Sequence, residues 1–352
     1  MRQNEMIKME VEKDKLRYML ERIKNIRIGV VGDGCLDIYW DADMRVSELS
    51  RETPHYPLPV VKERIYLGGG GNVAANVRSL EADAVYMLSL IGRDWRGDCL
   101  MSKLAEWGIH TRFMLADDNW VTPAYCKLMR RGYSDVVYED PRIDFENRAA
   151  ITDQQEAFIL DSLAALSNEV DVIIVCDQFR YGIISEQIRA ELEKLAGQGR
   201  KIIVDSRSRI SLFQHVIIKP NEIEAMMALD SGYISGEADL ESIACGAVKL
   251  YEQNKAPVII TMGNKGALWY AGENLYLAEG IPVEPPIDIV GAGDTFLAAF
   301  SCAYGAGFSG PESIAFANLA SSVVIKKIGT TGTVVPDEMI HQADKILFDT
   351  NK

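Results

Sequence analysis

The sequence has few of the patterns that mark metalloproteins, redox proteins and membrane proteins. Its 352 residues include only four histidines and six scattered cysteines, with no H-E-x-x-H and no C-x-x-C pattern. Ligands at zinc spacing and thiol redox pairs are therefore excluded as the basis of function. No apolar run reaches the roughly 18 residues that cross a bilayer, and the N-terminus is charged rather than a signal peptide. We expect a cytoplasmic protein with no membrane partner.

Positive charge is also in short supply. The chain has 37 Lys and Arg against 51 Asp and Glu, which gives a net charge of −14. A general nucleic-acid surface is excluded by this balance, and phosphate groups would have to be bound at a local site. Apolar residues make up 48% of the chain, enough for a large core.

A glycine-rich turn is the most informative stretch of the chain. An extended, proline-containing segment ends in Gly291-Ala292-Gly293-Asp294, and apolar residues follow at helical spacing. Backbone N–H groups at a helix start bind anions, so the glycines form a candidate anion site. The helix dipole is expected to keep Asp294 ionised, as a base beside an arriving phosphoryl group must be. A capping aspartate in a tight turn is the alternative, and the motif alone favours it.

The rest of the chain alternates buried strands with amphipathic helices. This alternation predicts an α/β fold, with a mostly parallel sheet covered by helices on both faces. Residues 1–26 are predicted to form an N-terminal helical extension, with residues 27–345 as the main domain. Two β-rich excursions, at about 38–67 and 111–142, interrupt its first half and indicate a lid or binding loop.

Polar residues follow several predicted strands, and the ends of parallel strands meet at one rim of a sheet. Asp37 follows the first strand, where a sugar-binding carboxylate and a turn residue are equally supported. Four glycines precede Asn72, so a ligand can approach the backbone closely there. A P-loop is excluded because no G-K-[ST] follows. Asp177 is a further carboxylate at a strand end.

Four motifs together resemble the ribokinase family of sugar kinases, also called the PfkB family. The turn at 288–296 is close to its D-T-x-G-A-G-D-x-F signature, with Ile289 in place of Thr. The 68–72 and 92–98 stretches resemble its N-terminal signature, Asn221-x-x-Glu224 its N-x-x-E motif, and 261–266 its nucleotide loop. The resemblance covers about residues 26–336. It implies a ribokinase-like fold with a small β-lid and an ATP-dependent sugar kinase.

The resemblance implies a role for each matching residue. Asp294 would be the base, with the backbone N–H groups of Gly291, Ala292 and Gly293 stabilising the transferred phosphoryl group. The predicted sugar-binding residues are Asp37, Gly69, Gly70, Asn72 and Asp177. The predicted nucleotide-binding residues are Asn221, Glu224, Thr261, Gly263, Gly266 and Asn318. Glu224 would bind Mg²⁺, directly or through water, whereas Asp288 is equally a ligand for a monovalent cation such as K⁺ or a turn carboxylate.

Within the family, the run from Gly32 to Trp40 and the Ser50–Pro54 stretch resemble kinases that act on D-glycero-D-manno-heptose 7-phosphate. Such an acceptor requires clustered arginines, for which the candidates are Arg45, Arg51, Arg142, Arg148, Arg180 and Arg207. Another sugar, hexose-phosphate or nucleoside kinase, or a catalytically silent member, are the alternatives. In the family the lid also forms a dimer surface, so we expect a homodimer.

Overall fold

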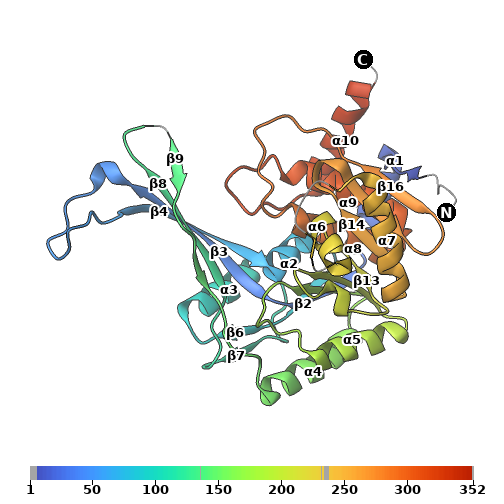
Figure 1. The fold of residues 1–352 in the computed structure, drawn as a ribbon, viewed down its shortest axis with the longest axis horizontal. Coiled ribbons are helices and arrows are strands. Elements are labelled where there is room, and N and C mark those ends of the chain that lie inside the picture. The colour runs from blue at the N-terminus through green and yellow to red at the C-terminus, as the bar shows by residue number, and fades with distance from the viewer. Residues whose placement is uncertain (1–5, 135, 231, 234–237, 351–352) are drawn as a thin grey trace.

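A nine-stranded sheet forms the centre of the molecule (Figure 1). The computed structural model describes residues 6–134, 136–230, 232–233 and 238–350. The strand order is β1-β16-β15-β14-β13-β12-β11-β2-β5, and all neighbours are parallel except β15, which is antiparallel to both β14 and β16. The strands are β1 (Ile7–Lys8), β2 (Arg27–Gly32), β5 (Ala84–Leu88), β11 (Val172–Asp177), β12 (Lys201–Ser206), β13 (Ile217–Ile218), β14 (Val258–Thr261), β15 (Gly266–Tyr270) and β16 (Leu275–Glu279).

The central strands are continuous apolar runs because both of their faces are buried. In β11, Val172 and Ile174 belong to the core on one face of the sheet, and Ile173 and Val175 belong to the core on the other. Successive side chains of a strand point to opposite faces, so one run of sequence supplies both cores.

Helices cover both faces, as the alternation of strands and helices predicts, and the α/β fold is confirmed. One core contains residues of α1 (Lys13–Ile23), α2 (Gly70–Ser79), α3 (Trp95–Glu106), α8 (Ala292–Gly305), α9 (Gly310–Val324) and α10 (Pro336–Thr350). The other contains residues of α4 (Asp153–Ser167), α5 (Glu186–Gly197), α6 (Glu222–Leu229) and α7 (Leu240–Asn254).

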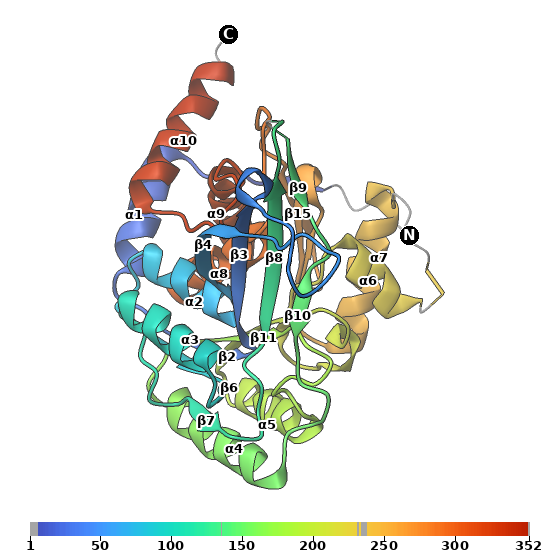
Figure 2. The same ribbon diagram turned by 90° about the vertical axis from the view of Figure 1, so that its left-hand side faces the viewer.

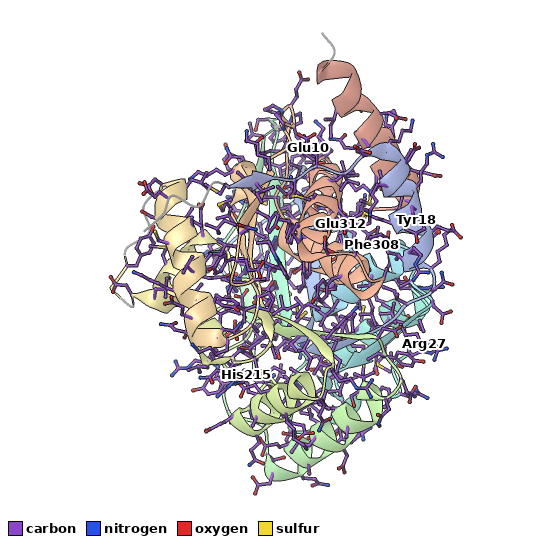
Figure 3. All side chains as sticks on the ribbon, turned by 90° about the vertical axis from the view of Figure 1, so that its right-hand side faces the viewer. Glu10, Tyr18, Arg27, His215, Phe308 and Glu312 are labelled. Atoms are coloured by element: carbon purple, nitrogen blue, oxygen red, sulfur yellow. The ribbon has the colours of Figure 1, made fainter. Side chains whose placement is uncertain are left out.

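The predicted N-terminal helix is α1, and it packs against the main body. Its four apolar residues at helical spacing, Leu16, Met19, Leu20 and Ile23, are all buried. On its outer side the Tyr18 ring meets Phe308 edge to face, with ring centroids 5.8 Å apart (Figure 3). The short strand β1, which the sequence analysis did not predict, pairs with β16.

A second sheet, which we call the lid sheet, projects from the body as an arm (Figure 1) and is seen face-on in Figure 2. It contains β3 (Gly34–Asp43), β4 (Val60–Gly69), β8 (Ala124–Arg131), β9 (Val137–Glu139) and β10 (Ile143–Phe145). Its boundaries differ from the predicted excursions. β7 (Leu115–Asp117) pairs instead with β6 (Leu90–Gly92) in a separate small sheet, and β10 lies beyond residue 142.

Within the described residues, none of the helices combines the length and the apolar character needed to cross a membrane.

Candidate active site

A cavity of about 330 Å³ lies where the lid sheet meets the rim of the central sheet. Its walls come from the ends of β12 and β14, the start of α8, and the lid strands β3, β4 and β8. Ligands of open α/β sheets bind at this carboxyl-terminal rim. The predicted site residues that line the cavity are Asp37, Gly69, Asn221, Glu224, Thr261, Gly291, Gly293 and Asp294.

The start of α8 has the features of an anion site. Gly291 has φ +79°, a conformation that favours glycine, and its backbone turns the chain into the helix. Among the described residues, the N–H groups of Gly291, Gly293 and Asp294 have no acceptor, whereas the Ala292 N–H donates to the Ile289 carbonyl at 3.1 Å. Three free N–H groups at a helix N-terminus favour a bound anion. The Ala292 N–H, which was predicted to stabilise the transferred phosphoryl group, is instead bonded within the turn.

Asp294 lies beside these N–H groups, in the first turn of α8. One of its oxygens accepts a hydrogen bond from Asn72 Nδ2 at 2.7 Å, so Asn72 orients the carboxylate. Burial raises the pKa of Asp294 to about 7, and the nearby carboxylates of Asp205 and Asp37 add to the rise. The expectation that the helix dipole keeps this group firmly ionised is therefore wrong. A pKa near neutrality suits a group that must accept a proton during the reaction.

Asp37 provides the second carboxylate of the cavity. It lies on β3, and its Oδ2 accepts a hydrogen bond from the Thr331 hydroxyl at 3.0 Å. Burial raises its pKa, although that hydrogen bond and the charges of Lys127 and Arg142 oppose the shift. A half-buried carboxylate with a free oxygen can accept a hydrogen bond from a ligand hydroxyl.

Lys219 places a buried positive charge in the same cavity. Its Nζ lies 3.1 Å from Asp205 Oδ2, and its side chain is only 4% exposed. Burial alone would lower the pKa of Lys219, but the Asp205 and Glu224 carboxylates outweigh burial and raise it. Lys219 is therefore a fixed cation close to Asp294, which suits a site for phosphate oxygens.

The N-x-x-E motif has a structural role. The Asn221 side chain accepts from the Glu224 N–H, and Glu224 Oε2 accepts from the Asn221 N–H, both at 2.8 Å. This reciprocal pair is a capping box at the start of α6. Both residues still line the cavity. The described residues contain no group of three acidic, His or Cys side chains that could hold a metal. A single carboxylate facing phosphates is sufficient for Mg²⁺, which is usually held by one or two carboxylates, substrate phosphates and waters.

Asp177 forms a buried ion pair with Arg209. Its carboxylate is bonded to the Arg209 guanidinium and accepts from the Ser206 hydroxyl at 2.5 Å. It does not line the cavity, and its neighbours Gln178 and Phe179 do so instead. The structure therefore places this predicted sugar-binding residue outside the cavity.

Seven other predicted residues also lie outside the cavity lining: Asn72, Asp288 and Ala292, which are described separately, and Gly70, Gly263, Gly266 and Asn318. Gly70 begins α2 behind Gly69. Gly266 has φ +96°, and a Cβ there would lie 1.9 Å from the Ala278 carbonyl oxygen, so its backbone position requires glycine. Gly263, with φ +54°, has open space around it. Asn318 Nδ2 donates to the Glu279 carbonyl at 2.6 Å, on the side of α9 that faces β16.

Asp288 behaves as a turn carboxylate in this structure. Its two oxygens accept from the Val290 N–H at 3.0 Å and the Gly329 N–H at 2.9 Å. These bonds tie the turn before α8 to the loop after α9.

Two of the six candidate arginines, Arg142 and Arg207, reach the cavity. The Arg142 guanidinium lies 4.1 Å from the centroid of the Tyr125 ring and is paired with Asp144. The other four lie outside the cavity lining; Arg45, for example, is paired with Asp43 in the lid. Two arginines at the cavity are the smallest number that we expect a phosphorylated acceptor to need.

Sequence reasoning missed Lys219 and Thr331. Lys219 directly precedes Pro220-Asn221, and Thr331 belongs to the run Gly329-Thr330-Thr331-Gly332. Neither position carries a signal by itself. Only the folded chain brings Lys219 near Asp294 and Thr331 to Asp37.

Comparison with known proteins agrees with the site. Residues 36–338 match the pfkB family of carbohydrate kinases. The bifunctional protein HldE of Citrifermentans bemidjiense is 30% identical over 345 residues, which cover 94% of this chain and 66% of that protein. HldE of Desulfatibacillum aliphaticivorans is 30% identical over 86% of this chain and 60% of its own length. The chain thus spans less than two thirds of the length of these relatives.

Solved structures show the same fold at lower identity. Ribokinase of Arabidopsis thaliana, complexed with ribose and ATP, superposes with a TM-score of 0.68 at 22% identity and covers 91% of this chain and 99% of its own. Phosphofructokinase-2 of Escherichia coli, complexed with fructose-6-phosphate, gives 0.71 at 18% identity and covers 92% and 99%. Because the family match extends over most of the chain and includes all but one of the cavity-lining residues, this protein is a sugar kinase and belongs to the pfkB family of carbohydrate kinases.

Proposed function

We propose that the enzyme transfers the γ-phosphoryl group of ATP to the anomeric hydroxyl of D-glycero-D-manno-heptose 7-phosphate. The observation that carries the chemistry is the position of Asp294, a carboxylate with a pKa of about 7 beside free helix N–H groups and a buried lysine. The heptose phosphate is supported by the sequence run from Gly32 to Trp40 and by the two arginines at the cavity.

In the proposed reaction, Asp294 accepts the proton of the attacking hydroxyl. A bond forms between that oxygen and the γ-phosphorus, and the bond to the β-phosphate oxygen breaks to release ADP. The N–H groups of Gly291 and Gly293, with Lys219, stabilise negative charge on the transferred group. Positioning and charge stabilisation are the main requirements of phosphoryl transfer.

The acceptor is proposed to lie between the lid and the rim of the sheet. Asp37 and the backbone at Gly69 would hold its hydroxyls, and Arg142 and Arg207 would hold its phosphate. Asn72 acts through Asp294 by orienting the carboxylate.

The phosphates of ATP are proposed to lie along Asn221, Glu224 and Thr261. The adenine is proposed to lie toward Gly263, Gly266 and Asn318. Mg²⁺ would be held by the phosphates and by Glu224 through water, and it would neutralise phosphate charge.

A K⁺ site at Asp288 would require its oxygens to bind a cation in addition to accepting the hydrogen bonds of two N–H groups. Stimulation of the rate by K⁺ but not Na⁺ would support that site. The six cysteines, all free, fit a cytoplasmic location.

The acceptor can be tested by comparing kcat/KM for heptose 7-phosphate with the values for unphosphorylated heptose, ribose, fructose 6-phosphate and adenosine. We expect heptose 7-phosphate to be preferred. Replacing Arg142 or Arg207 by Met should raise KM for a phosphorylated acceptor and leave KM for ATP unchanged. An unphosphorylated acceptor preferred by tenfold or more would reject the heptose phosphate and leave the family intact.

A further inference from the structure

Asp33 is a buried carboxylate that the proposed reaction does not use. It lies between β2 and β3, is 3% exposed, and does not line the cavity. Its Oδ2 accepts from the backbone N–H groups of Gln178 and Phe179, both at 2.9 Å. Its Oδ1 accepts from the Ile183 N–H at 3.0 Å. One side chain therefore holds three N–H groups of the loop that follows β11.

The backbone of Asp33 holds a second loop. Its carbonyl oxygen accepts from the Gly70 N–H at 2.8 Å, which fixes the glycine turn at the start of α2. The contact is close, since a Cβ at Gly69 would lie 2.7 Å from the same oxygen. On the other side, a Cβ at Gly182 would lie 2.4 Å from the Asp33 carboxylate. There is thus no room for a side chain at positions 69 and 182, where these loops approach Asp33.

Both loops form walls of the cavity. Gly69 contributes one wall, and Gln178 and Phe179 contribute another. The Phe179 ring lies against Tyr125 of the lid strand β8, with centroids 5.7 Å apart. Arg209 holds the same loop by its carbonyls, donating to Phe179 O at 3.2 Å. The 178–183 loop is thus fixed by its N–H groups on Asp33 and by a carbonyl on Arg209.

We propose that Asp33 is a positioning residue that sets the shape of the acceptor side of the cavity and thereby selects the sugar. The identity of the sugar rests on the proposed function, whereas the role of Asp33 does not. A carboxylate suits this position because it only accepts hydrogen bonds and offers two oxygens to three donors. An asparagine would offer one oxygen and present an NH₂ group to at least one backbone N–H, so the loop would have to move.

The test compares Asp33→Asn with a matched control, Asp171→Asn. Asp171 also accepts a backbone N–H of β2, that of Arg27 at 2.8 Å, but it lies at the opposite end of the strand. In Asp33→Asn we expect KM for the acceptor to rise by about tenfold or more, the scale of a misplaced binding group, with KM for ATP unchanged. Amide exchange at Gln178, Phe179 and Ile183 should become faster in the free protein. The control should show neither change.

A second variant moves the loop without altering the carboxylate. Gly182→Ala places a Cβ against Asp33 and should raise the acceptor KM in the same selective way. Equal effects on both substrates, or unchanged exchange in the loop, would overturn the proposal. If the parent enzyme does not use heptose 7-phosphate, the comparison is made with the acceptor it does use. The exchange measurement needs no acceptor, so failure of the proposed substrate and failure of the Asp33 role are distinguishable.

Discussion

At the residue scale, the active site concentrates buried and half-buried charge that would destabilise an ordinary core. Asp294, Asp37 and Lys219 are brought to one cavity from three distant parts of the chain. Burial raises the pKa of both carboxylates because desolvation disfavours their charged forms. A residue that costs stability in this way and still points into a cavity is a strong candidate for function.

Replacement of Asp294 by Asn should lower kcat by at least about 10²-fold, the scale of the loss of a general base. Binding of ATP, measured by fluorescence titration, should change little, because Asn72 can still donate to the new amide oxygen. Parent-like turnover in the purified variant would rule out Asp294 as the base.

The pH dependence provides a second measurement on the same residue. Since the base must be deprotonated, kcat/KM of the parent should rise with pH through about 7. The stability of the folded protein changes with pH in the opposite direction. The pKa in the folded state is above its unfolded value, so the folded protein loses stability as pH rises from about 4 to 7. At pH 8, Asp294→Asn should therefore unfold at a higher temperature than the parent. Its free energy of unfolding should be larger by an amount on the order of a few kcal/mol. A lower unfolding temperature in that variant would contradict the raised pKa.

Lys219 allows the roles of charge in stability and in catalysis to be separated. Lys219→Met leaves the carboxylate of Asp205 without its buried partner and should cost roughly 3–5 kcal/mol of unfolding free energy. It should also lower kcat, because a fixed cation near the transferred phosphoryl group is lost. Adding Asp205→Asn should restore most of the stability and none of the activity. Recovery of activity in the double variant would show that Lys219 acts only as a structural partner.

At the scale of elements, helix α8 and the lid sheet meet across the cavity. The N-terminus of α8 supplies the free N–H groups, and strands β3 and β8 supply Asp37 and Tyr125. Arg64 on β4 links the lid to the body through Asp41 and the Gly329 carbonyl. The loop that carries Gly329 also carries Thr331, which donates a hydrogen bond to Asp37. Arg64 and Asp37 therefore contact the same short segment.

The lid is expected to close over the acceptor and exclude water that would otherwise hydrolyse ATP. Hydrogen exchange in segments 38–67 and 111–142 should slow when saturating acceptor is added. The decrease should be largest in the lid strands and absent from α4, which lies on the far face of the sheet. Unchanged exchange under saturation would count against a closing lid.

At the scale of the whole molecule, the central sheet is covered on both faces but the lid sheet is not. Large apolar side chains of the lid are exposed, among them Val46, Leu49, Leu58, Val60, Val61 and Tyr138. Several large exposed apolar side chains on one sheet and its loops are typical of an interaction surface, and a second copy of the chain is the proposed partner.

A homodimer formed through the lid should be sensitive to charge on that surface. Val61→Asp should shift the mass measured by light scattering from dimer toward monomer, since a carboxylate would be desolvated at the contact. Leu212→Asp, at an equally exposed apolar position remote from the lid, should not. A parent chain that is monomeric at micromolar concentration would exclude this dimer.

The sequence by itself determined the fold class, most of the helices and half of the site. Strand runs such as 172–177 are apolar throughout because both faces are buried, and this pattern is local. The turn at Gly291–Asp294 is also local, because backbone conformation, helix start and carboxylate lie within four residues. Features of this kind can be predicted from a single stretch of chain.

The tertiary structure alone decided the pKa values of the site residues and the groups with which they form ion pairs and hydrogen bonds. The pKa of Asp294 depends on burial and on Asp205 and Asp37, which are distant in sequence, so the local dipole argument gave the wrong direction. Asp177 looked equivalent to Asp37 at a strand end, but Arg209 lies within reach of only one of them. Charge interactions and desolvation act through space, and a sequence pattern specifies them only after folding has placed the groups side by side.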